Sequence, residues 1–256
     1  MRNEYIVLKI WYMKQIPILF SHRDFLELYP TPTGFSSFVC RMLKQGRIKQ
    51  IKRGLYALVD PSTGDIYASC FQIASKLSDG AFFSYHEALT YYGLANQSFV
   101  SDFVYLSHAY SRNLDFQGVV YKAKKSDCSI QINDRMKEEG VRVVSLERAI
   151  VDSIDCPGLA GGLEEIEYAL DNVPKLDVSL VEQMLEHYDK DILYQKVGYL
   201  LEKHLGTKIK ESFYEKCLSH VKDKTVYFEA KVGHAKLNEK WKLMVDVGGD
   251  IPDELF

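Results

Sequence analysis

The sequence predicts an α+β protein in which an N-terminal winged helix-turn-helix precedes a helix-rich α+β body. Residues 21–60 contain two short amphipathic segments separated by a turn rich in Pro, Thr and Gly, and two β-prone runs then meet at Arg53 and Gly54. Basic side chains are concentrated in the same part of the chain. Helical periodicities and short alternating runs both recur in the residues that follow, which is typical of an α+β body.

The distribution of charge separates the N-terminal part from the rest. The chain has 256 residues, of which 46% are hydrophobic and 26% charged, an ordinary globular composition, and its formal net charge is -3. Residues 1–59 hold ten Lys or Arg and three Asp or Glu, a balance of +7, whereas residues 60–256 hold 22 and 32, a balance of -10. This asymmetry predicts that the N-terminal end meets a polyanion.

Two helices are predicted before the turn. Apolar residues recur at helical spacing within residues 3–15 and predict a first helix. Ser21 is a suitable N-cap for a second helix. The apolar face of this second helix consists of Phe25, Leu26 and Tyr29, and the prolines that follow end it.

A third helix is predicted from Thr33 to Gln45, with Gly46 as its C-terminal stop. Its apolar stripe has i, i+3, i+4, i+7 and i+8 spacing and consists of Phe35, Phe38, Val39, Met42 and Leu43. The side chains outside the stripe are short hydroxyls and cations, namely Thr33, Ser36, Ser37, Arg41 and Lys44. These groups can contact base edges and phosphates in a major groove, and a merely solvated helix face is the alternative interpretation.

The following run predicts a β-wing with a basic rim. Apolar residues alternate with cations on both sides of a tight turn at Arg53 and Gly54, and Lys49, Lys52 and Arg53 are the predicted phosphate contacts. A Pro-Ser-Thr-Gly stretch at 61–64 predicts a hinge. We therefore expect a DNA-binding domain at 1–64 and a second domain at 65–256, with a further subdivision near residue 175 as an alternative.

The second domain is predicted to consist mainly of helices with a few strands. Helices are expected at 66–77, at 84–92 with a capping box from Ser84 to Glu87, after Ser145, after a Pro-Gly-Gly loop, after Ser179, at 191–206 and at 211–221. Strands are expected at 100–107, 117–123, in the segment just before Ser145, at 225–229 and at 241–247.

Several classes of function find no support in the sequence. The five cysteines are scattered without a C-x-x-C pair, and the seven histidines form no metal-ligand pattern, so no metal or cofactor is expected. Phosphate-binding and nucleophile-elbow motifs are absent. The apolar opening is interrupted by charges, which argues against a signal peptide or membrane span and favours the cytoplasm. Glu229-Ala-Lys231 has a nuclease-like form, but no partner aspartate accompanies it.

An ordered set of five motifs resembles one family. The motifs are RGLYAL (53–58), FSYHEALTYYGL (83–94), SLERAIVDSIDCPGLAGGLEE (145–165), YQKVGYLLEKHLG (194–206) and LNEKWKLMVDV (237–247). Together they cover nearly the whole chain, and they are similar to AbiEi-type antitoxins of type IV toxin-antitoxin (abortive infection) systems and related predicted transcriptional regulators of viral defence.

The resemblance implies two activities and no catalysis. The N-terminal winged helix is expected to bind inverted repeats in its own promoter as double-stranded DNA, and the C-terminal antitoxin domain to neutralise a co-encoded nucleotidyltransferase-like toxin. Because the resemblance is densest there, Glu147, Arg148 and Asp152 are candidates for the antitoxin surface. An intramolecular pair between Arg148 and Asp152 is the plainer interpretation. A solitary transcriptional regulator, or a winged-helix-guided metal-dependent nuclease, remains an alternative function.

Overall fold

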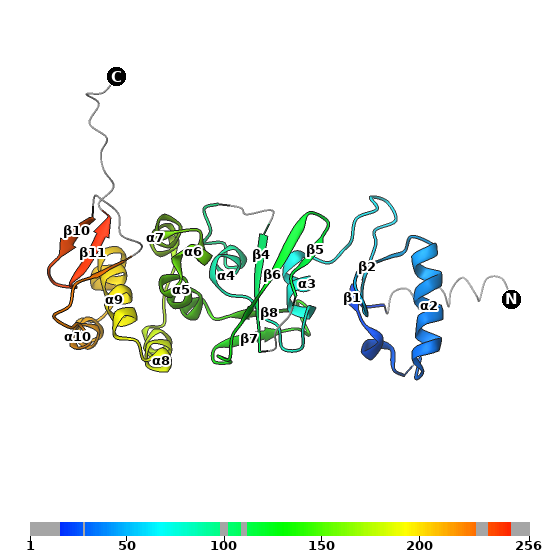
Figure 1. Cartoon of the computed structure of the whole chain (residues 1–256), viewed down its shortest axis with the longest axis horizontal. Helices are drawn as coiled ribbons and strands as arrows, with labels where there is room; N and C mark the ends of the chain where they lie inside the picture. Colours follow the sequence, from blue (N-terminus) through cyan, green and yellow to red (C-terminus); the bar gives the residue numbers. More distant parts are fainter. Residues whose placement is uncertain (1–15, 28, 98–101, 109–111, 229–234, 247–256) are drawn as a thin grey trace, which may run out of the picture. The chain divides into compact units, whose positions relative to one another are not determined.

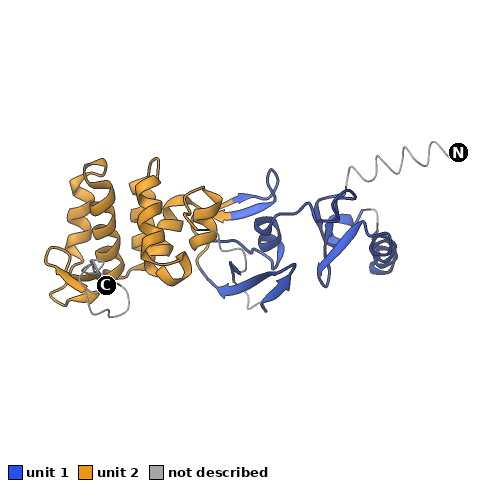
Figure 2. Ribbon diagram, turned by 90° about the horizontal axis from the view of Figure 1, so that it is seen from above, with its two compact units in different colours: residues 1–83, 100–127, 134–142 blue, residues 84–99, 128–133, 143–256 orange. Residues whose placement is uncertain are grey.

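The chain forms two compact units, each built from helices and sheets. The computed structural model describes residues 16–27, 29–97, 102–108, 112–228 and 235–246 (Figure 1). Unit 1 comprises residues 1–83, 100–127 and 134–142, and unit 2 comprises residues 84–99, 128–133 and 143–256 (Figure 2). The mixture of helix and strand confirms the predicted α+β class. The first helix predicted within residues 3–15 lies outside the described residues.

Helix α2 extends over Pro32–Lys44, within one residue of the prediction. Its cap is Thr31 and not a later residue, since the Thr31 hydroxyl accepts a hydrogen bond from the Gly34 amide at 3.3 Å. A proline at the first helical position has no amide hydrogen to leave unsatisfied. Gly46, with φ of 65°, follows the helix in the left-handed conformation that ends many helices.

The segment before the turn is shorter than predicted. It is a single 3-10 turn, η1 (His22–Phe25). At its start the Asp24 carboxylate accepts hydrogen bonds from both the amide and the hydroxyl of Ser21 at 2.7 and 3.0 Å. Phe25 is buried as expected, but Leu26 is 50% exposed, so its assignment to the apolar face was wrong.

An aromatic core holds η1 and α2 against the strands. Phe20, Phe25, Phe35 and Phe38 are all buried. The ring centroids of Phe20 and Phe25 are 5.2 Å apart, and those of Phe25 and Phe38 are 5.5 Å apart. Contacts at these spacings add to the stabilisation from burying the rings. The core fixes which face of α2 points inward, and therefore which face remains for solvent or a ligand.

Three short strands complete this N-terminal region. The strands are β1 (Leu19–Phe20), β2 (Ile48–Lys52) and β3 (Leu55–Leu58). They form an antiparallel sheet in the order β1-β3-β2. Gly54 has φ of 83° in the turn between β2 and β3, where glycine adopts the left-handed region without steric cost. The two predicted β-runs and the turn between them are thus confirmed.

The predicted hinge at 61–64 is a closed turn. The Asp60 carboxylate accepts hydrogen bonds from the amide and hydroxyl of Ser62 at 2.8 and 2.6 Å, and these bonds lower the pKa of Asp60. The Gly64 amide also donates to the Asp60 carbonyl at 2.8 Å. Residue 64 lies inside unit 1, and the predicted domain boundary at that residue stays a prediction.

The remainder of unit 1 contains a helix and a second sheet. Helix α3 (Cys70–Lys76) starts later than expected because Ser69 caps it. The strands β4 (Asp102–Ser107), β5 (Leu114–Phe116) and β6 (Val119–Lys125) form a sheet in the order β4-β6-β5, in which β4 and β6 are parallel. The short strand β5 was not predicted. Two further strands, β7 (Ile132–Arg135) and β8 (Val141–Val144), pair with each other, and each has residues assigned to both units.

Unit 2 is mainly helical. Its helices are α4 (Tyr85–Tyr91), α5 (Leu146–Asp155), α6 (Pro157–Ala160), α7 (Leu163–Asn172), α8 (Val178–Tyr188), α9 (Asp191–Leu205), η2 (Gly206–Lys208) and α10 (Glu211–Ser219). The Ser145 hydroxyl caps α5 by accepting from the Arg148 amide at 3.1 Å, as predicted. Helix α8 begins after Asp177 and not at Ser179, because the Asp177 carboxylate accepts from the Ser179 amide at 3.0 Å.

A small C-terminal sheet packs on α9. The strands β9 (Val226–Tyr227), β10 (Ala235–Asn238) and β11 (Leu243–Asp246) have the order β10-β11-β9. Trp241 is fully buried, and its indole N–H donates to Glu202 Oε2 at 2.7 Å. Gln195 Nε2 donates to the Trp241 carbonyl at 2.7 Å. None of the helices among the described residues is both long enough and apolar enough to cross a membrane.

Candidate nucleic-acid interface

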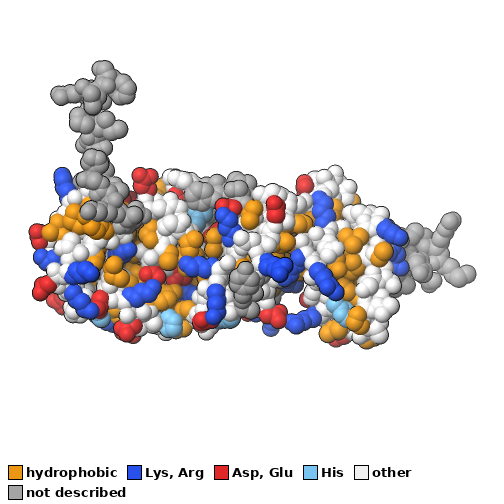
Figure 3. All heavy atoms as spheres, in the orientation of Figure 1, with side chains coloured by type: hydrophobic (Ala, Val, Ile, Leu, Met, Phe, Trp, Pro, Cys, Tyr) orange, Lys and Arg blue, Asp and Glu red, His pale blue; other side chains and the backbone are white. Residues whose placement is uncertain are grey.

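The face of α2 that points away from the aromatic core carries the predicted groove contacts. Every predicted residue of this set is exposed: Thr33, Ser36, Ser37, Arg41 and Lys44. The apolar stripe of the helix is buried except for Leu43, which is 36% exposed. The structure thus places the predicted hydroxyls and cations on one accessible surface. In Figure 3, basic side chains lie on the visible face of the N-terminal region, whereas acidic and basic ones mix over unit 2.

A shallow groove runs along this face of α2. Ser37, Cys40, Arg41, Lys44 and Gln45 line it. The Ser37 hydroxyl donates to the Thr33 carbonyl at 3.2 Å, so this hydroxyl presents its lone pairs outward as an acceptor. Cys40 and Gln45 were not predicted as part of the set. Helical spacing could have found them, since they lie three or four residues from Ser37 and Arg41 respectively.

The three cations predicted on the wing differ in their contacts. The Lys49 ammonium donates to the Gly64 carbonyl at 2.8 Å, and the Lys52 ammonium donates to the Leu77 carbonyl. Both groups keep their charge and two further N–H donors. Arg53 is exposed at the turn, with no hydrogen bond or ion pair of its guanidinium among the described residues. Arg53 is therefore the wing cation best placed to contact an external anion.

The antitoxin-surface candidates of unit 2 are mostly internal. Arg148 and Asp152 are 1% and 3% exposed, so their assignment to a surface was wrong. Their predicted pairing is present, with Arg148 Nε 3.3 Å from Asp152 Oδ2. Arg148 also donates to the Cys128 and Ile130 carbonyls, which satisfies a buried cation with backbone acceptors.

Asp152 accepts hydrogen bonds from side chains at the ends of two other helices. It accepts from the Ser84 hydroxyl at 2.6 Å and from the Tyr188 hydroxyl at 2.5 Å. The capping box predicted from Ser84 to Glu87 is consequently not formed, because the Ser84 hydroxyl is used by Asp152. Burial raises the pKa of Tyr188, and the negative charge of Asp152 raises it further, so this phenol stays a neutral donor.

Glu147 is the one member of that candidate set with an accessible side chain. It is half-buried and accepts from the Asp177 amide at 3.0 Å. It also lines a groove with Lys175, Lys208 and Lys210. Glu147 thus remains a candidate for a partner surface, whereas Arg148 and Asp152 hold α5 in place.

The described residues contain no cluster of three or more His, Cys, Asp or Glu able to hold a metal ion. His86 and Glu165 are both buried, and both contact backbone groups of the chain. Glu165 Oε1 accepts from the amides of Asn96 and Gln97 at 2.6 and 3.1 Å. Burial lowers the pKa of His86, whose Nε2 lies 3.0 Å from the Gln97 carbonyl. The nuclease-like motif at 229–231 lies outside the described residues.

Most of the chain has a structural counterpart among solved structures. It is similar to the crystal structure of the RV2827C protein from Mycobacterium tuberculosis, with a TM-score of 0.61 and 15% sequence identity. The match covers 90% of this chain and 86% of that one. At this identity the likeness shows a shared fold alone. No family model matches the chain, and no curated protein matches it.

Proposed function

We propose that the chain is a DNA-binding antitoxin that represses its own operon and counteracts a co-encoded nucleotidyltransferase-like toxin. The observation that carries the DNA-binding half is the outward face of α2, where the hydroxyls and cations lie opposite a buried aromatic stripe. A helix held by one face and followed by a basic two-stranded turn is how winged helices present side chains to double-stranded DNA.

The order of elements supports the assignment of a winged helix-turn-helix. Strand β1, the η1 turn, α2 and the β2-β3 hairpin follow one another, and β3 lies between β1 and β2 in the sheet. In this interpretation α2 is the helix that enters the major groove. Ser36, Ser37 and Arg41 govern the choice of sequence, and the wing cations contact phosphates.

The antitoxin half rests on the resemblance of unit 2 segments to AbiEi-type antitoxins. The segment 145–165, where the resemblance is densest, forms α5, α6 and the start of α7. Its pair of Arg148 and Asp152 is buried, so these two side chains are not available to contact a toxin. We therefore assign contact with the toxin to accessible residues, and the half-buried Glu147 and its groove are the first to test.

Two measurements test the proposal. The chain should bind a duplex from the region upstream of its own gene more tightly than a scrambled duplex, and Arg41→Ala should reduce that preference. Thr207→Ala, an exposed change on unit 2, is the control and should leave binding unchanged. Co-expression with the adjacent gene should restore growth that the adjacent gene alone stops. Sequence-specific binding without rescue would instead identify a solitary regulator, and absence of any DNA binding would refute the assigned interface.

A further inference from the structure

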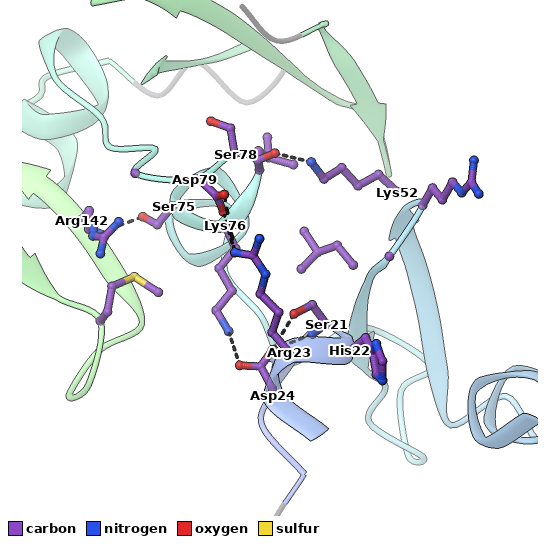
Figure 4. A pocket seen from close by; sticks show the side chains of 16 residues that line it. Ser21, His22, Arg23, Asp24, Lys52, Ser75, Lys76, Ser78, Asp79 and Arg142 are labelled. Atoms are coloured by element: carbon purple, nitrogen blue, oxygen red, sulfur yellow. Dashed lines mark hydrogen bonds and ion pairs between the residues drawn. The ribbon is translucent and has the colours of Figure 1, made fainter. Parts of the chain in front are cut away.

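A polar cleft lies beside the wing in unit 1 (Figure 4). Its volume is about 620 Å³. Five of the residues that line it are cationic, namely Arg23, Lys52, Arg53, Lys76 and Arg142, and two are acidic, Asp24 and Asp79. Positive charge is therefore in excess, and a concave site of one sign concentrates the opposite charge.

Internal partners hold most of these cations in place. Lys76 donates to the Leu19 carbonyl at 2.8 Å, and Lys52 donates to the Leu77 carbonyl. Arg142 is bound to the Asp134 carboxylate through Nε at 2.9 Å. Lys76 also lies 3.8 Å from Asp24 Oδ1, so a carboxylate of the cleft itself offsets its charge. The bond of Lys52 to a neutral carbonyl does not cancel the charge of its ammonium, which still attracts an anion into the cleft.

Arg23 is held in a different way. Its guanidinium points across the cleft toward Asp79, and its Nη1 lies 3.2 and 3.5 Å from the two carboxylate oxygens (Figure 4). The side chains of this pair are 78% and 90% exposed. Exposed pairs of this kind contribute little to stability. A carboxylate and a phosphate offer an arginine the same arrangement of acceptor oxygens, so a phosphate can take the place of Asp79.

We propose that this cleft binds a backbone phosphate of the DNA strand that passes the wing, with Arg23 as the contacting residue and Asp79 as its competitor in the free protein. This inference rests on the proposed DNA-binding function. Two observations favour a DNA phosphate over a free nucleotide. Lys52 and Arg53 belong to both the wing turn and the cleft, so a strand that touches Arg53 runs alongside the cleft. The cleft lining includes no Phe, Tyr or Trp on which the base of a free nucleotide could stack, and its one aromatic ring, that of His22, already packs on Phe35 with ring centroids 4.9 Å apart.

Opposite effects of two substitutions test the proposal. Binding of the full chain to a short duplex of random sequence is measured against salt concentration. Arg23→Ala should weaken binding and reduce the slope of log K against log salt by about 0.9, as expected for one lost phosphate contact. Asp79→Asn should tighten binding, because it removes the carboxylate that occupies Arg23. Arg135→Ala, which breaks an exposed pair with Glu139 outside the cleft, should change neither quantity.

The outcomes separate this proposal from the proposed function. If Arg23→Ala and Asp79→Asn both show the salt slope of the wild type while Arg41→Ala still impairs recognition, the proposed phosphate contact in the cleft is overturned and the proposed function is left intact. Stabilisation of the wild type by pyrophosphate but not of Arg23→Ala, with unchanged DNA binding, would make the cleft a site for a free anion and would also overturn the proposal. Thermal denaturation of each variant confirms that it is folded before its binding is compared.

Discussion

At the scale of single residues, Arg53 and Lys49 differ in what their cationic groups contact. Arg53 is exposed at the wing turn, whereas the Lys49 ammonium donates to the Gly64 carbonyl. We expect Arg53→Ala to weaken binding to all duplexes alike and to lower the salt slope by about 0.9. Lys49→Ala should have a smaller effect, because its ammonium is directed toward its own chain. Salt titrations by fluorescence anisotropy measure both slopes, and equal losses would show that the Gly64 contact does not restrain Lys49.

Gly198 is a second position where one residue has a clear consequence. A Cβ atom there would overlap the Trp241 ring and come within 2.9 Å of the Cys217 Cβ. We expect Gly198→Ala to destabilise the protein by roughly 1–3 kcal/mol through overpacking. Gly158→Ala is the matched control, since a Cβ at Gly158 meets nothing within 4 Å and its φ needs no glycine. Thermal denaturation compares the two, and equal melting temperatures would mean that the C-terminal sheet is not held against α9 by Trp241.

At the scale of elements, α5 is held by a buried ion pair that links it to its neighbours. Asp152 receives hydrogen bonds from Ser84 before α4 and from Tyr188 at the end of α8. Replacing Asp152 by Ala would leave the Arg148 cation buried without its partner, and we expect a loss of about 3–5 kcal/mol in the free energy of unfolding. Urea denaturation measures this loss.

An exposed pair at the same sequence separation provides the comparison. Arg135 Nη1 lies 2.8 Å from Glu139 Oε1, and the two side chains are 48% and 42% exposed. Glu139→Ala should therefore cost less than about 1 kcal/mol. The combination of Arg148→Met with Asp152→Leu removes both buried charges and should be more stable than Asp152→Ala alone. If Asp152→Ala were as stable as Glu139→Ala, the buried pair would not be what anchors α5.

At the scale of the whole molecule, basic and acidic charge divide along the chain. Residues 1–59 carry a balance of +7 and residues 60–256 a balance of -10. If the basic end supplies DNA binding and unit 2 supplies neutralisation, the two activities separate. We expect a full-length variant with Arg41→Ala and Arg53→Ala to lose DNA binding and still restore growth during co-expression with the toxin. Expression from an unrelated promoter keeps the protein level constant. Loss of rescue in that variant would indicate that neutralisation acts through transcription.

Features fixed by neighbouring residues were predicted from the sequence more accurately than features that depend on distant contacts. The bounds of α2 followed to within one residue from its apolar period and from Gly46, both of which act within a few residues. Strand β5 has three residues and depends on its pairing with β6, so no local pattern predicted it. The prediction of a capping box at Ser84 was wrong because it, too, depended on a distant residue. The Ser84 hydroxyl donates to the buried carboxylate of Asp152, 68 residues away, and local spacing does not reveal this contact.

The sequence by itself determined the α+β class, the face of α2 that carries Thr33, Ser36, Ser37, Arg41 and Lys44, and the β2-β3 hairpin with its cations, because helical and strand periods fix which side chains share a face. Only the tertiary structure decided which charged groups are accessible. It buried Arg148 and Asp152, turned Lys49 and Lys52 toward backbone carbonyls, and placed Arg23 against Asp79 beside the wing. Burial, and pairs such as Arg23 with Asp79, depend on residues far apart in the chain, and periodicity carries no information about such contacts.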